Sequence, residues 1–557
     1  MNYSNRRQFI QSLGVATAGL SVASTFPTKL LGEESQTRSR ATNDEPVLQT
    51  GDEIAVAQTE HGKVRGFILN GITCFRGIPY GADTSGENRF MPPTKPASWS
   101  DVRPALWWGP SAPQVMANRY ARNEASFIDH WNYYDLSEDC LKLNVWTPAL
   151  DDQKRPVIVW LHGGGFTEGN AIEQDGYHGE NFSRLGNVIY CSINHRLGPM
   201  GFSDFASALG EKYAQSGNVG MLDIVQGLEW IRDNIKNFGG DPENVTIIGQ
   251  SGGGAKVCTL MAMPAAKNLF HKAVSLSGSS LSGLKKEYSE KLGNYILAEA
   301  RLTAADTAAL HKMSWEDYLA LAHRSAKRLN QESPGLAGRR GGFGPTGDGH
   351  VLPIEPFFSD PHGLSSSVPL IVCSTFNESS PSREDSSLEN VTLDQVKEKL
   401  HQRFGENTDK IVKAYNKVFP GKKPVEIWSL VASNRQAPVA VANAKSKQEA
   451  PVYLAWFGFQ PPLFDGRMRA FHTLDISFWF ANTDRMWTHS GGGARPRELS
   501  HKMANSLLQF MKTGNPNGGG LPEWPAYTAV KGETMILNDH CEIKSDPDRE
   551  ARATLPA

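Results

Sequence analysis

Near-continuous apolar runs alternate with amphipathic stretches through the middle of the chain. The runs are rich in Val, Ile and Leu and are bounded by Gly, Pro or Asn, which is typical of strands buried on both faces of a sheet. Predicted strands of this kind are PVIVWLH (156–162), NVIYCSINHR (187–196), NVTIIG (244–249), KAVSLS (272–277), PLIVCST (369–375) and PVYLAWFGF (451–459).

The segment 221–238, between two of these runs, has the spacing of an amphipathic helix. Its charged residues fall mostly on one side and its apolar residues on the other; the apolar positions are Leu222, Val225, Leu228, Ile231, Ile235 and Phe238. Alternating strands and helices predict an α/β fold with a large, mostly parallel central sheet flanked by helices. In such sheets ligands bind at the carboxyl ends of the strands, where we expect the chemistry.

Two further amphipathic blocks, at 285–330 and 393–432, predict helical insertions into this framework. No convincing linker divides the chain. We therefore expect a single α/β domain over residues 51–545, followed by a polar tail over 546–557.

The N-terminus predicts an export signal. Arg6-Arg7 stands before Phe9-Ile10 and a short apolar run, as in twin-arginine signals, and Ser21-Val22-Ala23 offers a small-x-small cleavage site. Polar residues interrupt the run, which falls short of the roughly 20 apolar residues that span a membrane. We expect a signal peptide over 1–30, a polar linker over 31–50, and a periplasmic or secreted protein with no membrane span after signal removal.

Composition and charge limit the partners. Apolar residues at 39%, charged residues at 21% and a mean hydropathy of −0.40 describe a water-soluble globular protein. The 57 basic and 59 acidic side chains give a formal net charge of −2, so no global field favours nucleic acid. The six cysteines include no C-x-x-C or Cys/His metal spacing, so no zinc or other metal site is expected.

The segment NVTIIGQSGGGAKVCTL (244–260) allows two chemistries. A phosphate-binding loop would use Lys256, but it requires Gly-Lys-Ser/Thr in direct succession, and here Ala255 separates Gly254 from Lys256. The alternative is a Gly-x-Ser-x-Gly nucleophile elbow, in which Ser251 stands at a sharp turn from strand to helix. Glycines two positions before and after the serine provide the small residues that this turn requires, so we favour the nucleophile.

A serine nucleophile needs a base to accept its proton and a carboxylate to orient that base. In this type of sheet the chain order is serine, acid, histidine. Glu378 follows the predicted strand 369–375, and His472 follows the predicted strand 451–459. We predict Ser251 as nucleophile, Glu378 as the orienting acid and His472 as the base, with purely structural roles as the alternative for Glu378 and His472.

The run HGGGF after the predicted strand 156–162 indicates an oxyanion hole, because glycines let backbone N–H groups approach a developing negative charge closely. Gly164 and Gly165 are the predicted donors, together with Gly252 directly after the serine. Phe166 is predicted to line the substrate pocket. A flexible strand-to-helix turn is the alternative for this run.

Several long motifs follow one another in a distinctive order: SEDCLKLNVWTP, VIVWLHGGGFTEGN, INHRLGPMGF, GNVGMLDIVQGLEWIRDNIKNFGGDPENVTIIGQSGGG, HKAVSLSGS and FMKTGNPNGGGLPEWPAYT. Together they resemble the type-B carboxylesterase family, over about residues 54–538. The resemblance implies an α/β-hydrolase fold and cofactor-free hydrolysis of a small-molecule carboxylic ester. It also maps the family's triad onto Ser251, Glu378 and His472, and its oxyanion donors onto the three glycines named above.

Departures from the family pattern affect some of these expectations. The family commonly pairs the cysteine that is Cys140 here with an upstream cysteine, but Ala112 stands at that place, so we expect no disulfide there. Gln250 and Gly252 stand where Glu and Ala are usual, and Gly252 still offers an N–H. The same triad acting on amides, carbamates or lipids, or a non-catalytic binding protein of the same fold, are the alternative functions.

Overall fold

The computed structural model describes residues 46–115, 124–128, 135–336 and 342–556. The predicted signal peptide and most of the predicted polar linker lie outside these residues. Val47–Ala557 forms one compact unit. All the helices and strands given below lie in the described residues of this unit.

A twelve-stranded sheet forms the centre of this unit, in the order β1-β4-β5-β7-β9-β8-β10-β11-β14-β15-β16-β17. Neighbours from β9 to β16 run parallel, whereas the pairs at both edges are antiparallel. The strands are β1 (Leu48–Gln49), β4 (Phe67–Leu69), β5 (Ile72–Pro79), β7 (Lys142–Thr147), β8 (Arg155–Leu161), β9 (Ile189–Ile193), β10 (Gly240–Gln250), β11 (Lys272–Leu276), β14 (Leu370–Thr375), β15 (Val452–Phe457), β16 (Glu533–Leu537) and β17 (Glu542–Ser545). The six predicted strands are confirmed as β8, β9, β10, β11, β14 and β15, all in the parallel part.

Two small sheets accompany the large one. The first has the order β2-β3-β6 and the second joins β12 to β13. Their strands are β2 (Val56–Thr59), β3 (Gly62–Arg65), β6 (Arg103–Pro104), β12 (Leu284–Lys285) and β13 (Thr346–Gly347).

The central strands are buried on both faces, as their continuous apolar sequences predict. In β8 the adjacent residues Val159 and Trp160 are both 0% exposed, yet they belong to different core clusters. Because successive side chains of a strand point to opposite faces, the two clusters lie on the two sides of the sheet. One cluster includes side chains of α5 (Val219–Asn234), the predicted amphipathic helix, and the other includes side chains of α17 (Ala494–Thr513).

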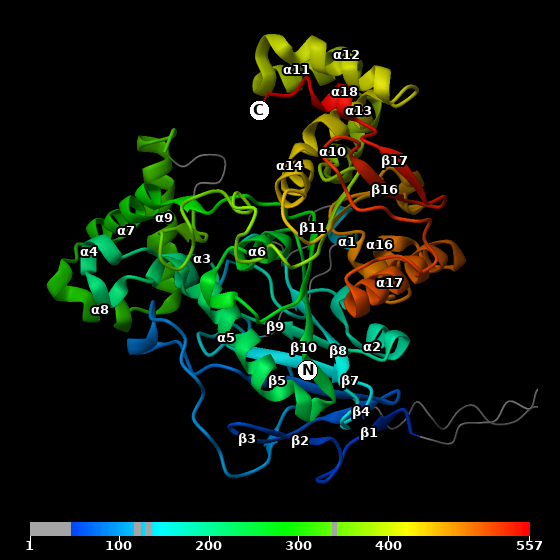
Figure 1. The fold of residues 1–557 in the computed structure, drawn as a ribbon. Coiled ribbons are helices and arrows are strands. Elements are labelled where there is room, and N and C mark those ends of the chain that lie inside the picture. The colour runs from blue at the N-terminus through cyan, green and yellow to red at the C-terminus, as the bar shows by residue number, and fades with distance from the viewer. Residues whose placement is uncertain (1–45, 116–123, 129–134, 337–341, 557) are drawn as a thin grey trace, which may run out of the picture. The chain divides into compact units, whose positions relative to one another are not determined.

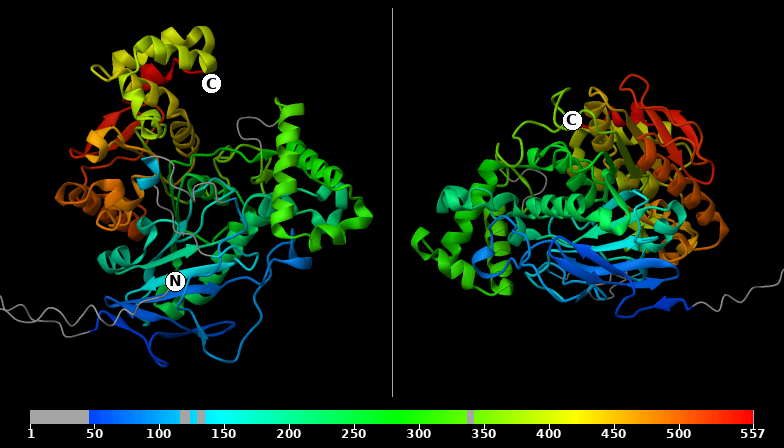
Figure 2. Two further views of the ribbon diagram at one scale, coloured as in Figure 1. Left: turned by 180° about the vertical axis from the view of Figure 1, so that it is seen from behind. Right: turned by 60° about the horizontal axis from the view of Figure 1, so that its bottom comes forward.

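Both predicted helical insertions are confirmed, as α7 to α9 and as α11 to α13. Figures 1 and 2 show them as two separate groups of helices, and α12 contacts the short α18 close to the C-terminus. None of the helices in the described residues has the length and apolar character needed to cross a membrane. The remaining helices are α1 (Ala125–Ile128), α2 (Glu180–Gly186), α3 (Gly198–Phe202), α4 (Ala206–Leu209), α6 (Gly252–Leu260), α7 (Lys286–Ala300), α8 (Thr307–Lys312), α9 (Trp315–Glu332), α10 (Pro381–Glu384), α11 (Leu393–Phe404), α12 (Thr408–Val418), α13 (Pro424–Ala432), α14 (Gln436–Lys445), α15 (Ile476–Trp479), α16 (Trp487–Ser490) and α18 (Arg549–Arg552).

The segment predicted as a polar tail, 546–557, is largely a packed part of the structure. Ala551 of α18 is 0% exposed, and the buried carboxylate of Asp548 lies 2.9 Å from the guanidinium of Arg435. The polar composition of this segment predicts a tail. In the structure, however, Asp548 pairs with Arg435, which is distant along the chain. The domain therefore extends past the predicted boundary at 545.

Candidate active site

Ser251 occupies the junction between β10 and α6. Strand β10 ends at Gln250, α6 begins at Gly252, and Ser251 has φ 57° and ψ −121°. A positive φ is uncommon for a residue with a side chain and indicates a strained turn, as in a nucleophile elbow. The Ser251 N–H donates to the carbonyl of Leu276 at 2.8 Å, which fixes the turn to β11.

The small residues around this turn are needed because backbones meet there without intervening side chains. A Cβ on Gly249 would lie 2.4 Å from the carbonyl oxygen of Gly253. A Cβ on Gly253 would lie 1.9 Å from the carbonyl oxygen of Leu161, the last residue of β8. Any larger residue would force α6 away from the sheet.

The three predicted oxyanion donors meet beside the serine. Gly164 and Gly165 follow β8 with φ +77° and +65°. A Cβ on Gly252 would lie 2.0 Å from the carbonyl oxygen of Gly165, so the glycine loop and the start of α6 are in backbone contact. Gly252 is the first residue of α6, and its N–H therefore has no acceptor within the helix.

Glu378 and His472 form a close hydrogen-bonded pair. The Nδ1–H of His472 donates to Oε2 of Glu378 at 2.5 Å. The other carboxylate oxygen, Oε1, accepts from the backbone N–H of Thr375 at 2.7 Å, at the end of β14. With its proton on Nδ1, the neutral ring of His472 keeps a lone pair on Nε2, as a general base requires.

Electrostatics around His472 favour its protonated form. Shielding from water lowers the pKa of His472, but the charge of Glu378 and the hydrogen bond to it outweigh this cost, so the pKa lies above its ordinary value. Asp475 lies three residues further on and is 0% exposed. Burial, together with the negative charge of Glu378, raises the pKa of Asp475 to about 7.

Gln250 contacts the base directly. Its side-chain nitrogen lies 3.3 Å from Nε2 of His472. Among the described residues, this amide rather than the Ser251 hydroxyl is within hydrogen-bonding distance of Nε2. The same amide nitrogen lies 3.4 Å from Nδ1, so the amide is almost equidistant from the two ring nitrogens and does not lie along the in-plane lone pair of Nε2.

A cavity of about 330 Å³ brings Ser251, Glu378 and His472 together in its wall. Hydroxyl and small side chains make up the rest of the lining, which contains Ser277, Gly278, Ser279, Ser374, Ser379, Ala432, Ser433, Asn434, Ala437 and Pro438. Phe166, predicted to line the substrate pocket, is not among these residues. Its ring packs edge-on against Phe202, with the ring centroids 5.5 Å apart.

Asn377 joins the loop of the acid to the loop of the base. Its backbone N–H donates to the carbonyl of Ala470 at 3.1 Å, and its side-chain oxygen accepts from the N–H of Ala470 at 3.3 Å. Its side-chain nitrogen donates to the Ser429 hydroxyl of α13 at 2.8 Å, and this hydroxyl donates to the carbonyl of Ser379. Glu378, between Asn377 and Ser379, is thereby held on both sides.

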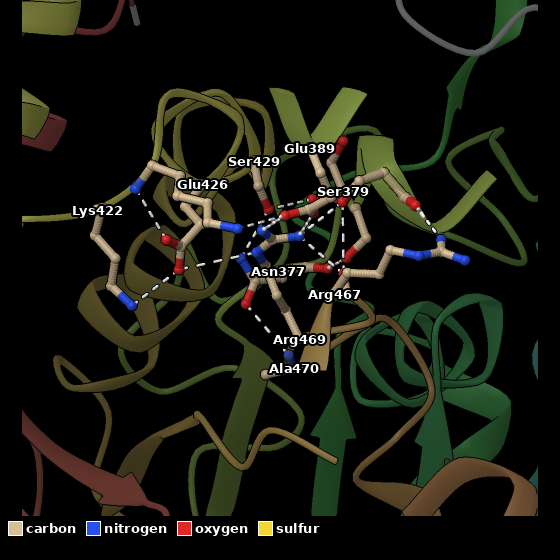
Figure 3. Close-up of polar contacts among 12 residues, drawn as sticks. Asn377, Ser379, Glu389, Lys422, Glu426, Ser429, Arg467, Arg469 and Ala470 are labelled. Atoms are coloured by element: carbon tan, nitrogen blue, oxygen red, sulfur yellow. Dashed lines mark hydrogen bonds and ion pairs between the residues drawn. The ribbon is translucent and has the colours of Figure 1, made fainter. Parts of the chain in front are cut away.

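Arg469 supports the same two loops from a buried position, with its guanidinium directed toward Glu389 (Figure 3). It donates to the two carboxylate oxygens of Glu389 at 2.6 and 3.0 Å, and to the carbonyl of Arg467 at 2.8 Å. Burial alone would raise the pKa of Glu389, but the hydrogen bond from Arg469 contributes to lowering it to about 2. The ionised pair fixes the chain three residues before His472.

Sequence reasoning missed Asn377, Arg469 and Asp475 and did not assign a role to Gln250. Each lies within three residues of a predicted catalytic side chain. Their polar character next to the predicted catalytic residues was the only sign of a role in the sequence. Their roles depend on contacts with segments that are distant in the sequence, which this sign does not reveal.

Residues 53–554 match the carboxylesterase family. The para-nitrobenzyl esterase of Bacillus subtilis (strain 168) is 34% identical over 509 residues, which cover 90% of this chain and 98% of that protein. Phenmedipham hydrolase of Pseudarthrobacter oxydans is 31% identical, with 90% of this chain and 99% of that protein covered.

Solved structures agree with this match. An esterase from Clostridium hathewayi, described as able to hydrolyse aliphatic aromatic polyesters, superposes with a TM-score of 0.77 at 30% identity, covering 90% of this chain and 98% of that one. The carboxylesterase EST55 of Geobacillus stearothermophilus gives a TM-score of 0.74 at 31% identity, with 90% and 100% covered. The chain has the α/β-hydrolase fold and belongs to the carboxylesterase family of carboxylic ester hydrolases.

Proposed function

We propose that the chain hydrolyses small carboxylic esters through an acyl-enzyme on Ser251, with His472 as base and Glu378 as the acid that orients it. The observation that carries the proposal is the 2.5 Å hydrogen bond between Glu378 and Nδ1 of His472, in the wall of the cavity that also contains Ser251. The strained conformation of Ser251 supports it further.

In the first half of the reaction, the oxygen of Ser251 attacks the ester carbonyl while Nε2 of His472 takes the hydroxyl proton. Glu378 stabilises the imidazolium, and the N–H groups of Gly164, Gly165 and Gly252 bind the oxyanion. The bond to the alcohol then breaks, His472 returns the proton to the leaving oxygen, and the acyl group stays on Ser251.

In the second half, a water molecule attacks the acyl-enzyme and gives a proton to the same Nε2 atom. The oxyanion forms again in the same hole. Collapse of this intermediate releases the carboxylic acid, and the proton on His472 returns to the oxygen of Ser251. Apart from the ester and this water molecule, the cycle uses groups of the chain itself.

Replacing Ser251 with Ala should abolish hydrolysis of a short-chain nitrophenyl ester, with a loss of about 10⁶-fold in kcat, because no acyl-enzyme can form. The matched control is Ser325→Ala, a buried serine of α9 whose hydroxyl donates to the carbonyl of Leu321. Both variants are compared with the unmodified chain by kcat and by thermal unfolding. If folded Ser251→Ala protein has the same kcat as the control, Ser251 is not the nucleophile.

The pH dependence of kcat/KM should follow His472. The base must be neutral, and its pKa lies above the ordinary value, so kcat/KM should rise with pH through a midpoint above about 6.5. Glu378→Gln removes the charge that raises this pKa, so the midpoint should move to lower pH while the maximal kcat/KM falls by about 10⁴-fold. Glu384→Gln, an exposed glutamate of α10, is the control. An unchanged midpoint in Glu378→Gln contradicts the assignment of the acid.

The lining of the cavity favours small substrates. An apolar pocket gains about 0.8 kcal/mol of binding free energy for each methylene group that it buries. A lining of hydroxyl groups does not provide this gain for an alkyl chain. For nitrophenyl esters, kcat/KM should therefore be highest for short acyl groups and at least tenfold lower for dodecanoate than for butanoate. Amides and carbamates of the same size should be slower. A steady rise of kcat/KM with chain length argues for a lipid substrate instead.

We also propose that the chain is exported by the twin-arginine route, which is supported by Arg6-Arg7 before Phe9-Ile10. Changing both arginines to lysine keeps the charge but removes the guanidinium pair, and should lower the exported fraction of the esterase activity at least tenfold. The matched control changes Arg38 and Arg40, in the predicted linker, to lysine. Equal export of the two double variants would exclude this route.

A further inference from the structure

Lys256 is a buried cation directly behind the candidate active site. It lies in α6, five residues after Ser251, and is 0% exposed. Removing an ammonium from water is costly unless its surroundings compensate it. An apolar side chain would fill this space at a lower cost in desolvation free energy. We therefore expect a role of the ammonium group itself.

The contacts of Lys256 lie on both sides of the glycine loop. Its ammonium donates to the carbonyl of His162 at 2.9 Å, and His162 is the residue immediately before Gly163 to Gly165. The same nitrogen lies 5.6 Å from the ring centroid of Phe166, the residue immediately after these glycines, in a cation–π contact. One side chain thus holds both ends of the loop that contains two of the proposed oxyanion donors.

The titratable groups that face Lys256 come from three other segments. The rings of His162 and His195 stack with centroids 5.0 Å apart, and each Nδ1–H donates to a backbone carbonyl. Burial, and then the charge of Lys256, lower the pKa values of both histidines, so both rings are neutral. Burial lowers the pKa of Lys256 to about 7, and the charge of Glu173 opposes this shift.

We propose that Lys256 is a positioning residue for the oxyanion hole: its protonated amine holds the His162 carbonyl and the Phe166 ring, and so keeps the N–H groups of Gly164 and Gly165 in place. This inference rests on the proposed acyl-enzyme mechanism. The ammonium also adds a fixed positive charge behind the site where negative charge develops. In a buried site, such a charge acts at low dielectric and needs no reorganisation during the reaction.

A purely structural lysine would make the same kind of contact without affecting turnover. Lys445 at the end of α14 provides this comparison, because it is also 0% exposed and donates to the carbonyls of Ser365 and Ser366 at 2.8 and 3.2 Å. These carbonyls precede β14, whereas the candidate site lies after the carboxyl ends of β10 and β14. The two lysines are thus equally buried and both donate to backbone carbonyls, but they lie at opposite ends of the parallel strands.

The test compares Lys256→Met with Lys445→Met in the full chain, using a short-chain nitrophenyl ester and counting active sites by titration of Ser251. Thermal unfolding of both variants shows whether they are folded. Lys256→Met should also lower kcat per active site at least tenfold while KM stays within about twofold, because the loop acts on the transition state. Lys445→Met should leave kcat per active site unchanged.

The pH profile separates the charge from the packing. In the unmodified chain and in Lys445→Met, kcat should fall at alkaline pH as Lys256 loses its proton, and Lys256→Met should lack this descending limb. If Lys256→Met does not fold, Lys256→Gln takes its place, because it keeps an N–H donor for the His162 carbonyl but has no charge. It should also lack the descending limb and have a lower kcat.

The outcomes that overturn the inference are distinct from those that overturn the mechanism. Ser251-dependent hydrolysis with the same kcat per active site and the same pH profile in Lys256→Met and Lys445→Met would refute the role of Lys256 alone. Absence of Ser251-dependent hydrolysis in the unmodified chain would refute the proposed function, and the inference with it.

Discussion

The candidate site depends on direct backbone contact between α6 and the end of β8. Gly253 meets the carbonyl of Leu161 and Gly252 meets the carbonyl of Gly165, with no room for a Cβ at either place. This close approach sets the position of Ser251 relative to the glycine loop, and Lys256 ties the same helix to the carbonyl of His162. The proposed nucleophile and oxyanion donors are therefore positioned by one interface, whose geometry is fixed by main-chain atoms rather than by adjustable side chains.

The proposed acid and base are held by a separate assembly. Glu378 follows β14 and His472 follows β15, and parallel pairing of these strands brings the two loops to the same edge of the sheet. Asn377 then bonds the loops to each other, and Arg469 anchors the base loop to Glu389. The two assemblies meet at the cavity, where the side chain of Gln250 contacts the ring of His472.

The sequence predicts the elements of this arrangement better than their connections. Continuous apolar strands, the Gly-x-Ser-x-Gly turn and the order of serine, acid and histidine are local patterns, and they placed Ser251, Glu378 and His472 around one cavity. The roles of Asn377, Arg469 and the pair between Arg435 and Asp548 depend on contacts between distant segments, which no local pattern reports. Lys256 is the clearest example. The sequence motif suggested only phosphate binding as a role for this residue, whereas in the structure it is buried and donates to the carbonyl of His162.

The balance of charge around His472 explains why a neutral Gln250 suits this site. Glu378 already raises the pKa of the imidazole, and Asp475 adds a smaller effect of the same sign. A second full carboxylate at position 250, in contact with Nε2, would stabilise the imidazolium further and reduce the fraction of neutral base at pH 7. An amide in this position contacts the ring without adding charge.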